Sequence, residues 1–212
     1  MSDLGLVTAY LYMLGSILHV PGGVLLLEGV PSHIRVWSTY SYILGCSAFF
    51  LAGFIDLAVA ILSDMKKRKV LMFTLYFIAA TLVLSGALLY LPFFGKNGSF
   101  MGSQLYRGGS SCYFISAGLN VMNVYWDLKE QKRSIEAVLS SLYRSKVLSN
   151  LFYMCGSVSL LTGGALSQLG IAGAPELWTL GGCWLVVGSS FLIKNELNHI
   201  ANSEAKTKTM SV

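Results

Sequence analysis

Long apolar segments alternate with short polar connections along the whole chain. Each segment has about 20 residues, the length that an α-helix needs to cross roughly 30 Å of hydrocarbon. The six segments are 4–27, 41–62, 70–91, 108–126, 148–170 and 177–193. The pattern predicts an all-α fold, a polytopic membrane protein with six transmembrane helices.

The first and fifth segments share one pattern of small residues. Residues 12–25 and 153–166 both carry Tyr-Met, Gly-Ser, Gly-Gly and Leu at the same positions, and residues 76–89 follow the pattern more loosely. In each even-numbered segment a glycine stands two residues before a serine, in the triplets that begin at Gly45, Gly109 and Gly188. A pattern used three times predicts three related helical hairpins.

These observations predict one membrane domain over residues 1–200. Its hairpin units are 4–62, 70–126 and 148–198, joined between the second and third unit by a connector over 127–147, and a polar, disordered tail follows at 201–212. In the connector, apolar residues recur at helical spacing opposite charged ones, which predicts an amphipathic helix on the membrane surface. It is either a solvated extension of the fourth span or a surface that binds a partner or lipid.

The recurring small residues have a physical explanation. Apolar side chains gain little from leaving lipid, so helices in a bilayer associate where small residues let their backbones approach closely. We expect the helices of each hairpin to pack through glycines that share one helix face. The predicted helix-packing residues are Gly15, Gly22, Gly45, Gly109, Gly156, Gly163 and Gly188.

One hairpin resembles a known family. Its first helix has Tyr-Met-x-Gly-Ser from Tyr153, and its second begins at Trp178 and ends in Gly188-Ser189. This arrangement resembles the YrhK-type membrane domain, clearest over residues 151–193 and fainter over 11–50. The resemblance implies a two-helix membrane module and brings no catalytic residues with it.

Composition and charge sharpen the picture. The chain is 54% hydrophobic and 12% charged, with a mean hydropathy of +0.63, whereas soluble domains have about 25% charged residues. Lys and Arg gather in the segments that lie on the side of both termini, and only Arg35, Lys96 and Arg107 lie on the other side. Because positive charge favours the cytoplasmic side, both termini are predicted to be cytoplasmic, with the basic face on anionic lipid of the inner leaflet and no role for nucleic acid.

Two further features fit this topology. The sequon at Asn97 lies in the predicted 92–107 loop on the opposite side from the termini, so Asn97 is a candidate glycosylation site. Several aromatic residues lie near span ends, where membrane proteins carry a belt of Trp and Tyr. These residues are Trp37, Tyr40, Tyr42, Tyr90, Tyr106, Tyr125, Trp126 and Trp178.

Three polar residues within the apolar segments are candidate functional residues. His19 lies in the first segment two residues before Pro21, Asp56 lies in the second, and Asn120 takes the place in the fourth that corresponds to Asp56. Polar and ionisable groups at membrane depth are costly and often mark a solute path. His19 and Asp56 either relay a proton or cation, or bond to neighbouring helices. Their different depths argue against direct contact.

The sequence contains no arrangement of a nucleophile, base and acid, no zinc-binding motif and no carboxylate pair, so we expect no enzyme, cofactor or metal. The leading interpretation is a non-catalytic multi-pass membrane protein that acts as a scaffold, associates with lipid or binds other membrane proteins or a second copy of itself. The alternative is a small transporter or channel whose polar path runs near His19, Asp56 and Asn120.

Overall fold

The structure, a computed structural model, describes residues 2–130 and 141–210, with the side chains of 4–130 and 144–202. It is built from long helices, and the described residues include no strand. The elements are α1 (Ser2–Val24), α2 (Ser32–Leu62), α3 (Lys67–Leu89), the 3-10 turn η1 (Pro92–Phe94), α4 (Gly95–Glu130), α5 (Ser141–Gln168) and α6 (Ala174–Met210). The predicted all-helical fold is confirmed.

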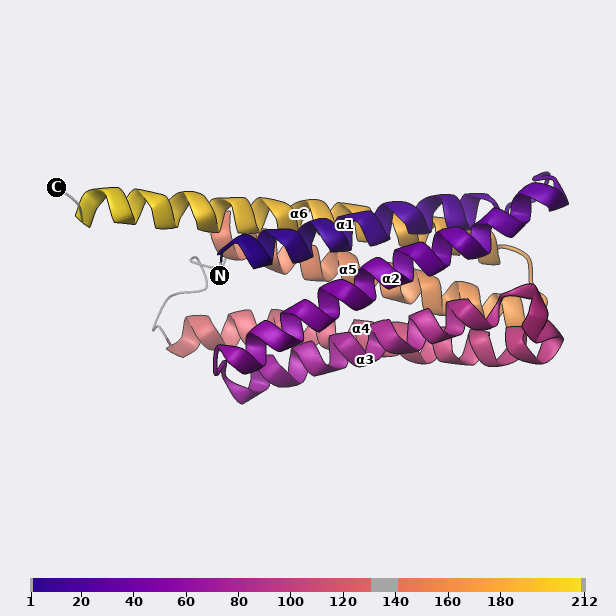
Figure 1. The fold of residues 1–212 in the computed structure, drawn as a ribbon, viewed down its shortest axis with the longest axis horizontal. Coiled ribbons are helices and arrows are strands. Elements are labelled where there is room, and N and C mark those ends of the chain that lie inside the picture. The colour runs from indigo at the N-terminus through magenta and orange to yellow at the C-terminus, as the bar shows by residue number, and fades with distance from the viewer. Residues whose placement is uncertain (1, 131–140, 211–212) are drawn as a thin grey trace.

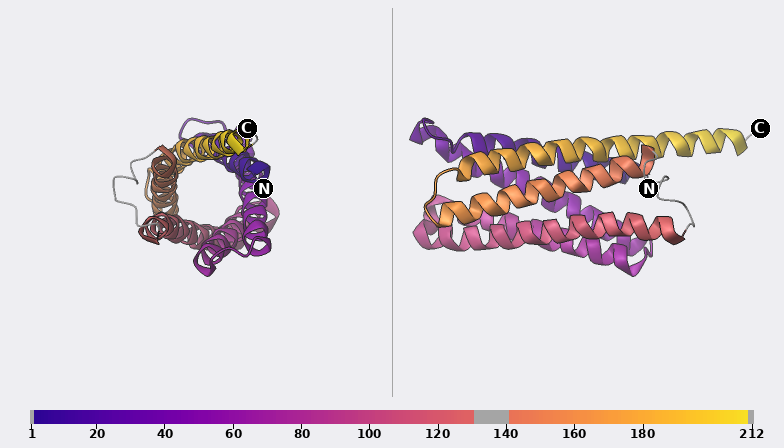
Figure 2. Two further views of the ribbon diagram at one scale, coloured as in Figure 1. Left: turned by 90° about the vertical axis from the view of Figure 1, so that its left-hand side faces the viewer. Right: turned by 180° about the vertical axis from the view of Figure 1, so that it is seen from behind.

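The helices form a closed ring. Each packs against its neighbours in the chain, and α6 returns to pack against α1. Figure 2 shows the ring end-on, and in Figure 1 both termini lie toward the same end of it. The two helices of each predicted hairpin pack against each other. Helices of different hairpins do so too, since α2 packs against α3 and α4 packs against α5. These contacts alone therefore do not separate three hairpins from six helices that follow one another around a ring.

Most helices extend well beyond the apolar segments. Helix α2 begins at Ser32, and α4 begins at Gly95, directly after η1. The expectation of a loop over 92–107 is therefore wrong. Gly95 has a φ of +61°, which only glycine adopts readily, so it turns the chain from η1 into α4. Apolar runs mark the part of a helix that lipid surrounds, whereas hydrogen bonding continues through the polar flanks.

Five helices are long and apolar enough to cross a membrane, judged by length and composition: α1, α2, α3, α5 and α6. Helix α4 is outside this group although it lies in the ring between α3 and α5. Its many polar residues lower its mean hydropathy. They face the interior of the ring, however: Ser110, Ser116 and Asn123 are buried, whereas Ile115 and Met122 are exposed. A hydropathy average does not distinguish polar residues that face protein from those that face lipid.

The predicted connector divides between two helices. Residues 127–130 complete α4, and 141–147 begin α5, while 131–140 lie outside the described residues. At the C-terminus, α6 continues to Met210, where the sequence analysis expected a disordered tail from residue 201. Residues 201–210 contain neither Gly nor Pro, and Ala, Glu and Lys among them favour helix, so α6 meets no stop signal.

Glycines lie where neighbouring helices approach most closely. A β-carbon on Gly15 would lie 2.8 Å from the carbonyl oxygen of Gly45, and one on Gly109 would lie 2.8 Å from that of Ala79. At each predicted helix-packing glycine, such a carbon would meet the paired helix at 2.6–3.0 Å. Sequence analysis missed the reciprocal contact of Gly86 and Gly102, where each added carbon would lie 2.7 Å from the other's oxygen.

Candidate functional site

The ring buries many polar side chains beside its apolar core and exposes large apolar side chains on its outside. His19 and Asn123 are the largest side chains among those that are almost fully buried, and several serines accompany them. On the outside, large apolar side chains are half exposed or more, among them Leu44, Leu51 and Phe54. Water-soluble proteins show the opposite arrangement, with polar groups mostly outside. The polar groups with the potential to bind a solute therefore lie inside the ring.

Three cavities share their walls. We call them proximal, central and distal, in order from the end of the ring that holds the termini. Their volumes are about 300, 20 and 220 Å³. Tyr106 lines both the distal and the central cavity, and Tyr12, Tyr76 and Tyr153 line both the central and the proximal cavity. The cavities therefore adjoin one another, and tyrosine side chains are the residues that neighbouring cavities share.

The boundary between the central and proximal cavities consists of Tyr12, Tyr76 and Tyr153, here called the tyrosine triad. They come from alternate helices, α1, α3 and α5. The ring of Tyr12 lies 5.9 Å from that of Tyr76 and 6.2 Å from that of Tyr153, both edge to face. The Tyr153 hydroxyl is 2.7 Å from Ser189 Oγ. Sequence analysis did not select these residues, although each is the first residue of the repeated pattern.

His19 lies at the other end of the central cavity and is 1% exposed. Its Nδ1 lies 2.8 Å from the carbonyl oxygen of Gly15, and its Nε2 lies 3.0 Å from the hydroxyl of Tyr106. A carbonyl can only accept, so the neutral ring carries its proton on Nδ1 and accepts the Tyr106 hydroxyl at Nε2. His19 thereby fixes Tyr106 at the boundary of the distal cavity. Tyr106 is 8% exposed, so its assignment to a lipid-facing aromatic belt is wrong.

Two polar groups at the central cavity have no hydrogen-bond partner in the described part of the chain. They are Ser110 Oγ and the hydroxyl of Tyr113, and both residues line this cavity. A buried polar group without a partner costs about 1–3 kcal/mol. The cavity volume of about 20 Å³ is enough for one water-sized molecule. The central cavity therefore suits a single small polar molecule or group.

The proximal cavity contains most of the charge inside the ring. Asp56, Lys146 and Glu196 line it together with the amides of Asn120 and Asn150. The Tyr12 hydroxyl donates to Asp56 Oδ2 at 2.9 Å, and Asn120 Nδ2 donates to Asn150 Oδ1 at 3.1 Å. The ion pairs found among the described residues do not include any of the three charged groups. Neutral groups bond to both carboxylates instead, since Asp56 accepts from Tyr12 and Glu196 accepts from Asn195 Nδ2 at 3.2 Å.

The structure thus brings together two of the three candidate polar residues. Asp56 and Asn120 line the same cavity, whereas His19 lies beyond the tyrosine triad and bonds to Gly15 and Tyr106. Lys146 and Glu196 were not predicted as site residues. In the sequence Lys146 is one of the basic residues expected at the membrane surface, and no spacing rule connects it with residues of α1 and α2.

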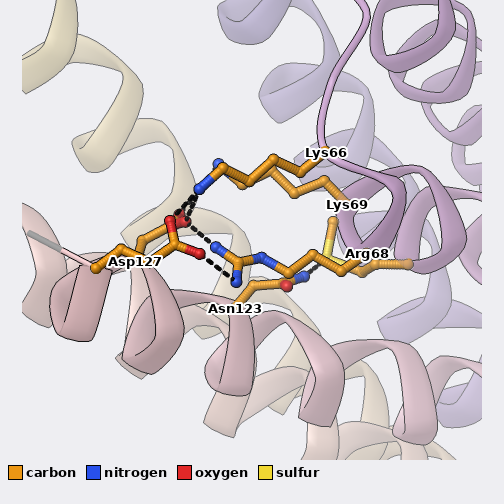
Figure 3. Close-up of polar contacts among 7 residues, drawn as sticks. Lys66, Arg68, Lys69, Asn123 and Asp127 are labelled. Atoms are coloured by element: carbon orange, nitrogen blue, oxygen red, sulfur yellow. Dashed lines mark hydrogen bonds and ion pairs between the residues drawn. The ribbon is translucent and has the colours of Figure 1, made fainter.

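A group of ion pairs joins the start of α3 to the end of α4 (Figure 3). Arg68 Nη2 lies 2.5 Å from Asp127 Oδ1, and Lys69 Nζ lies 3.1 Å from Asp127 Oδ2. Glu130 accepts from Arg68 at 2.9 Å and also pairs with Lys66. Two carboxylates therefore neutralise a small part of the positive charge at this end within the protein, which slightly weakens its attraction for anionic lipid.

The ion pairs predict a pH-dependent contribution to stability. Partial burial opposes ionisation of Asp127, but hydrogen bonds and charge from Lys69 and Arg68 outweigh it and hold the pKa of Asp127 below its usual range. Stabilisation is then complete above the unfolded value of about 4 and is lost as pH falls through the lower folded value. Asp127→Asn should cost about 1 kcal/mol at neutral pH. Thermal unfolding in detergent measures this.

The control for this substitution is Asp64→Asn, because Asp64 is exposed and takes part in none of the ion pairs in the described regions. The difference between wild type and Asp127→Asn should shrink as the pH falls below about 4, while Asp64→Asn should match wild type at neutral pH. A difference that is independent of pH would contradict a role for ionised Asp127.

The remaining sequence features are the sequon at Asn97, the four cysteines and any metal-binding group. Asn97 is exposed, but it lies in the first turns of α4. All four cysteines are free. Within 2–130 and 141–210, no group of three or more His, Cys, Asp or Glu residues is placed to hold a metal ion.

Comparisons with models of known protein families, with curated proteins and with solved structures find no match for this chain. The resemblance of residues 151–193 to the YrhK-type domain therefore stays a prediction.

Proposed function

We propose that this chain is a six-span membrane protein that conducts a small polar solute through its ring of helices. The observation that carries the proposal is the series of three adjoining cavities, in which neighbouring cavities share Tyr106 or the tyrosine triad as lining residues. A protein that only presents an outer surface to partners has no need of unpaired charge inside it. Of the three charged residues, Asp56 lies within an apolar segment, where an ionisable group is costly and is typical of solute paths.

The proposal includes six crossings with both termini in the cytoplasm. Five helices are apolar enough to span, and α4 lies in the same ring between two of them. Because the polar side chains of α4 are buried and its apolar ones exposed, it can cross a bilayer despite its low average hydropathy. The excess of Lys and Arg near both termini supports the orientation, and the basic residues without carboxylate partners are those that would attract anionic lipid.

A threefold repeat of hairpins is also part of the proposal. Tyr12, Tyr76 and Tyr153 hold equivalent places in the repeated pattern and meet at one boundary in the ring. Residues that are equivalent in sequence and converge in space are expected where three related units surround a common axis. Each unit then contributes one side chain to the closure of the path.

Solute flux into proteoliposomes tests the proposed path. We expect vesicles that contain the purified protein to take up one or more of water, formamide and methylammonium, small enough for passage through the narrow central cavity, faster than protein-free vesicles. Ser110→Phe should reduce uptake to the protein-free rate, because the new ring fills the central cavity that Ser110 lines. Light scattering after an osmotic step measures uptake of the neutral solutes, and a radiolabel measures that of methylammonium.

The matched control is Ser190→Phe, since Ser190 is exposed on the outside of α6. This variant should conduct as wild type does. Circular dichroism and size-exclusion chromatography would show that both variants fold. Equal uptake by wild-type and Ser110→Phe vesicles, or no uptake above the protein-free rate for any solute, would reject the path.

A further inference from the structure

The charges of the proximal cavity are unequal in number. Among the described residues that line it, Asp56 and Glu196 contribute two carboxylates and Lys146 one ammonium group. Glu196 is near enough to interact electrostatically with both of the others, and Lys146 also interacts with Lys69 and Asp127, which form an ion pair with each other. Even if Lys146 compensates one carboxylate, the other remains without a positive partner among these residues. Electrostatics in this cavity therefore favour a cation.

The wall of the same cavity is aromatic where it meets the path. The three rings of the tyrosine triad border the proximal cavity. Aromatic faces attract ammonium groups, by about 0.5–1 kcal/mol at exposed sites and about 2 kcal/mol where water is excluded. An organic cation held by Asp56 would lie beside Tyr12, whose hydroxyl bonds to that carboxylate. An inorganic anion would find no comparable partner at this boundary.

On the other side of the tyrosine triad, the central cavity contains hydrogen-bond acceptors for an ammonium group. Ser110 Oγ and the hydroxyl of Tyr113 lack partners there, and each has an oxygen that can accept an N–H bond. A volume of about 20 Å³ limits the occupant to the size of one water molecule, which a primary ammonium group matches. A quaternary ammonium group is too large.

We infer that the proximal cavity is a binding site for a small primary ammonium cation, held by Asp56 and Glu196 beside the tyrosine triad. The inference rests on the proposed function, for which it names the class of solute. Lys146 acts in this site as a built-in competitor, because its own ammonium group neutralises part of the charge that attracts the ligand. A zwitterion would instead use Lys146 as the partner of its carboxylate.

Binding of three matched probes to the full chain in dodecyl maltoside tests the site by isothermal titration calorimetry. Methylammonium carries only the cation, acetate only the anion, and glycine both. Methylammonium should bind and acetate should not. Asp56→Asn and Glu196→Gln, which keep side-chain size, should each weaken methylammonium binding by about tenfold or more, as expected for a charged hydrogen bond. Lys146→Met should strengthen it.

Two controls lie outside the cavity. Asp64→Asn and Lys194→Met make the same chemical changes at exposed positions and should leave binding unchanged. Micelles that also contain phosphatidylethanolamine form a second arm, since its headgroup carries the same ammonium chemistry. Methylammonium binding that survives there supports a soluble cation, and binding that is abolished overturns the inference in favour of the lipid headgroup.

The outcomes separate the site from the path. Tighter binding of acetate or glycine than of methylammonium, or weaker binding of methylammonium after Lys146→Met, overturns the cation site. Absence of methylammonium binding while water or formamide still enters vesicles overturns the site and leaves the path standing. Binding without uptake of any solute supports the site and rejects the path.

Discussion

Replacement of Gly15 by alanine should destabilise the ring by about 2 kcal/mol, the cost of forcing an extra carbon into a packed contact. The added carbon would lie 2.8 Å from the backbone oxygen of Gly45 and 3.0 Å from the ring of Phe49. A backbone oxygen cannot rotate away, so α1 and α2 must separate. The wider separation of α1 and α2 also weakens the hydrogen bonds that Ser38 and Ser41 of α2 donate to backbone carbonyls of α1.

Gly118→Ala is the matched control, because Gly118 also lies inside a helix and an added carbon there meets nothing within 4 Å. That variant should be as stable as wild type or gain up to about 1 kcal/mol from the better helix propensity of alanine. Thermal unfolding followed by circular dichroism in one detergent compares the three proteins. If Gly15→Ala melted together with Gly118→Ala, close approach at Gly15 would not stabilise the ring.

Apolar run length predicted the helical fold, but it predicted helix ends poorly. The runs reflect contact with lipid, whereas Ser32 and Gly95 begin helices in polar stretches that keep their backbone hydrogen bonds in water. For α4, the apolar run at 108–126 predicts a span, whereas the helix is not among those apolar enough to cross a membrane by length and composition. The sixth crossing therefore stays a prediction.

The candidate site was predictable only in part. His19, Asp56 and Asn120 stood out because each interrupts an apolar run, and two of them line one cavity. Lys146 and Glu196 lie in polar flanks, where charged residues are ordinary, and only closure of the ring brings them to Asp56. Tyrosines are common at the lipid interface as well as inside a membrane protein. The many tyrosines in the sequence therefore did not indicate a boundary between internal cavities.

Tyr76→Ala should increase solute flux several-fold, because it opens the boundary between the central and proximal cavities. Tyr76 is the member of the tyrosine triad best suited to this test. Its hydroxyl takes part in no hydrogen bond found among the described side chains, whereas Tyr12 binds Asp56 and Tyr153 binds Ser189. Removal of its ring therefore widens the path without breaking a polar contact. The proteoliposome assay measures the effect with the solute that wild type conducts.

Two matched variants decide whether the ring of Tyr76 is the barrier. Tyr76→Phe keeps the ring and should conduct as wild type does, and Tyr10→Ala removes a tyrosine that is 53% exposed on the outside of α1 and should have no effect. Truncation of a buried aromatic residue costs about 3–5 kcal/mol, so folding of Tyr76→Ala is checked by circular dichroism before flux is compared. A folded Tyr76→Ala with wild-type flux would show that the triad does not limit passage, and the barrier would then lie at Tyr106, which His19 holds at the other boundary.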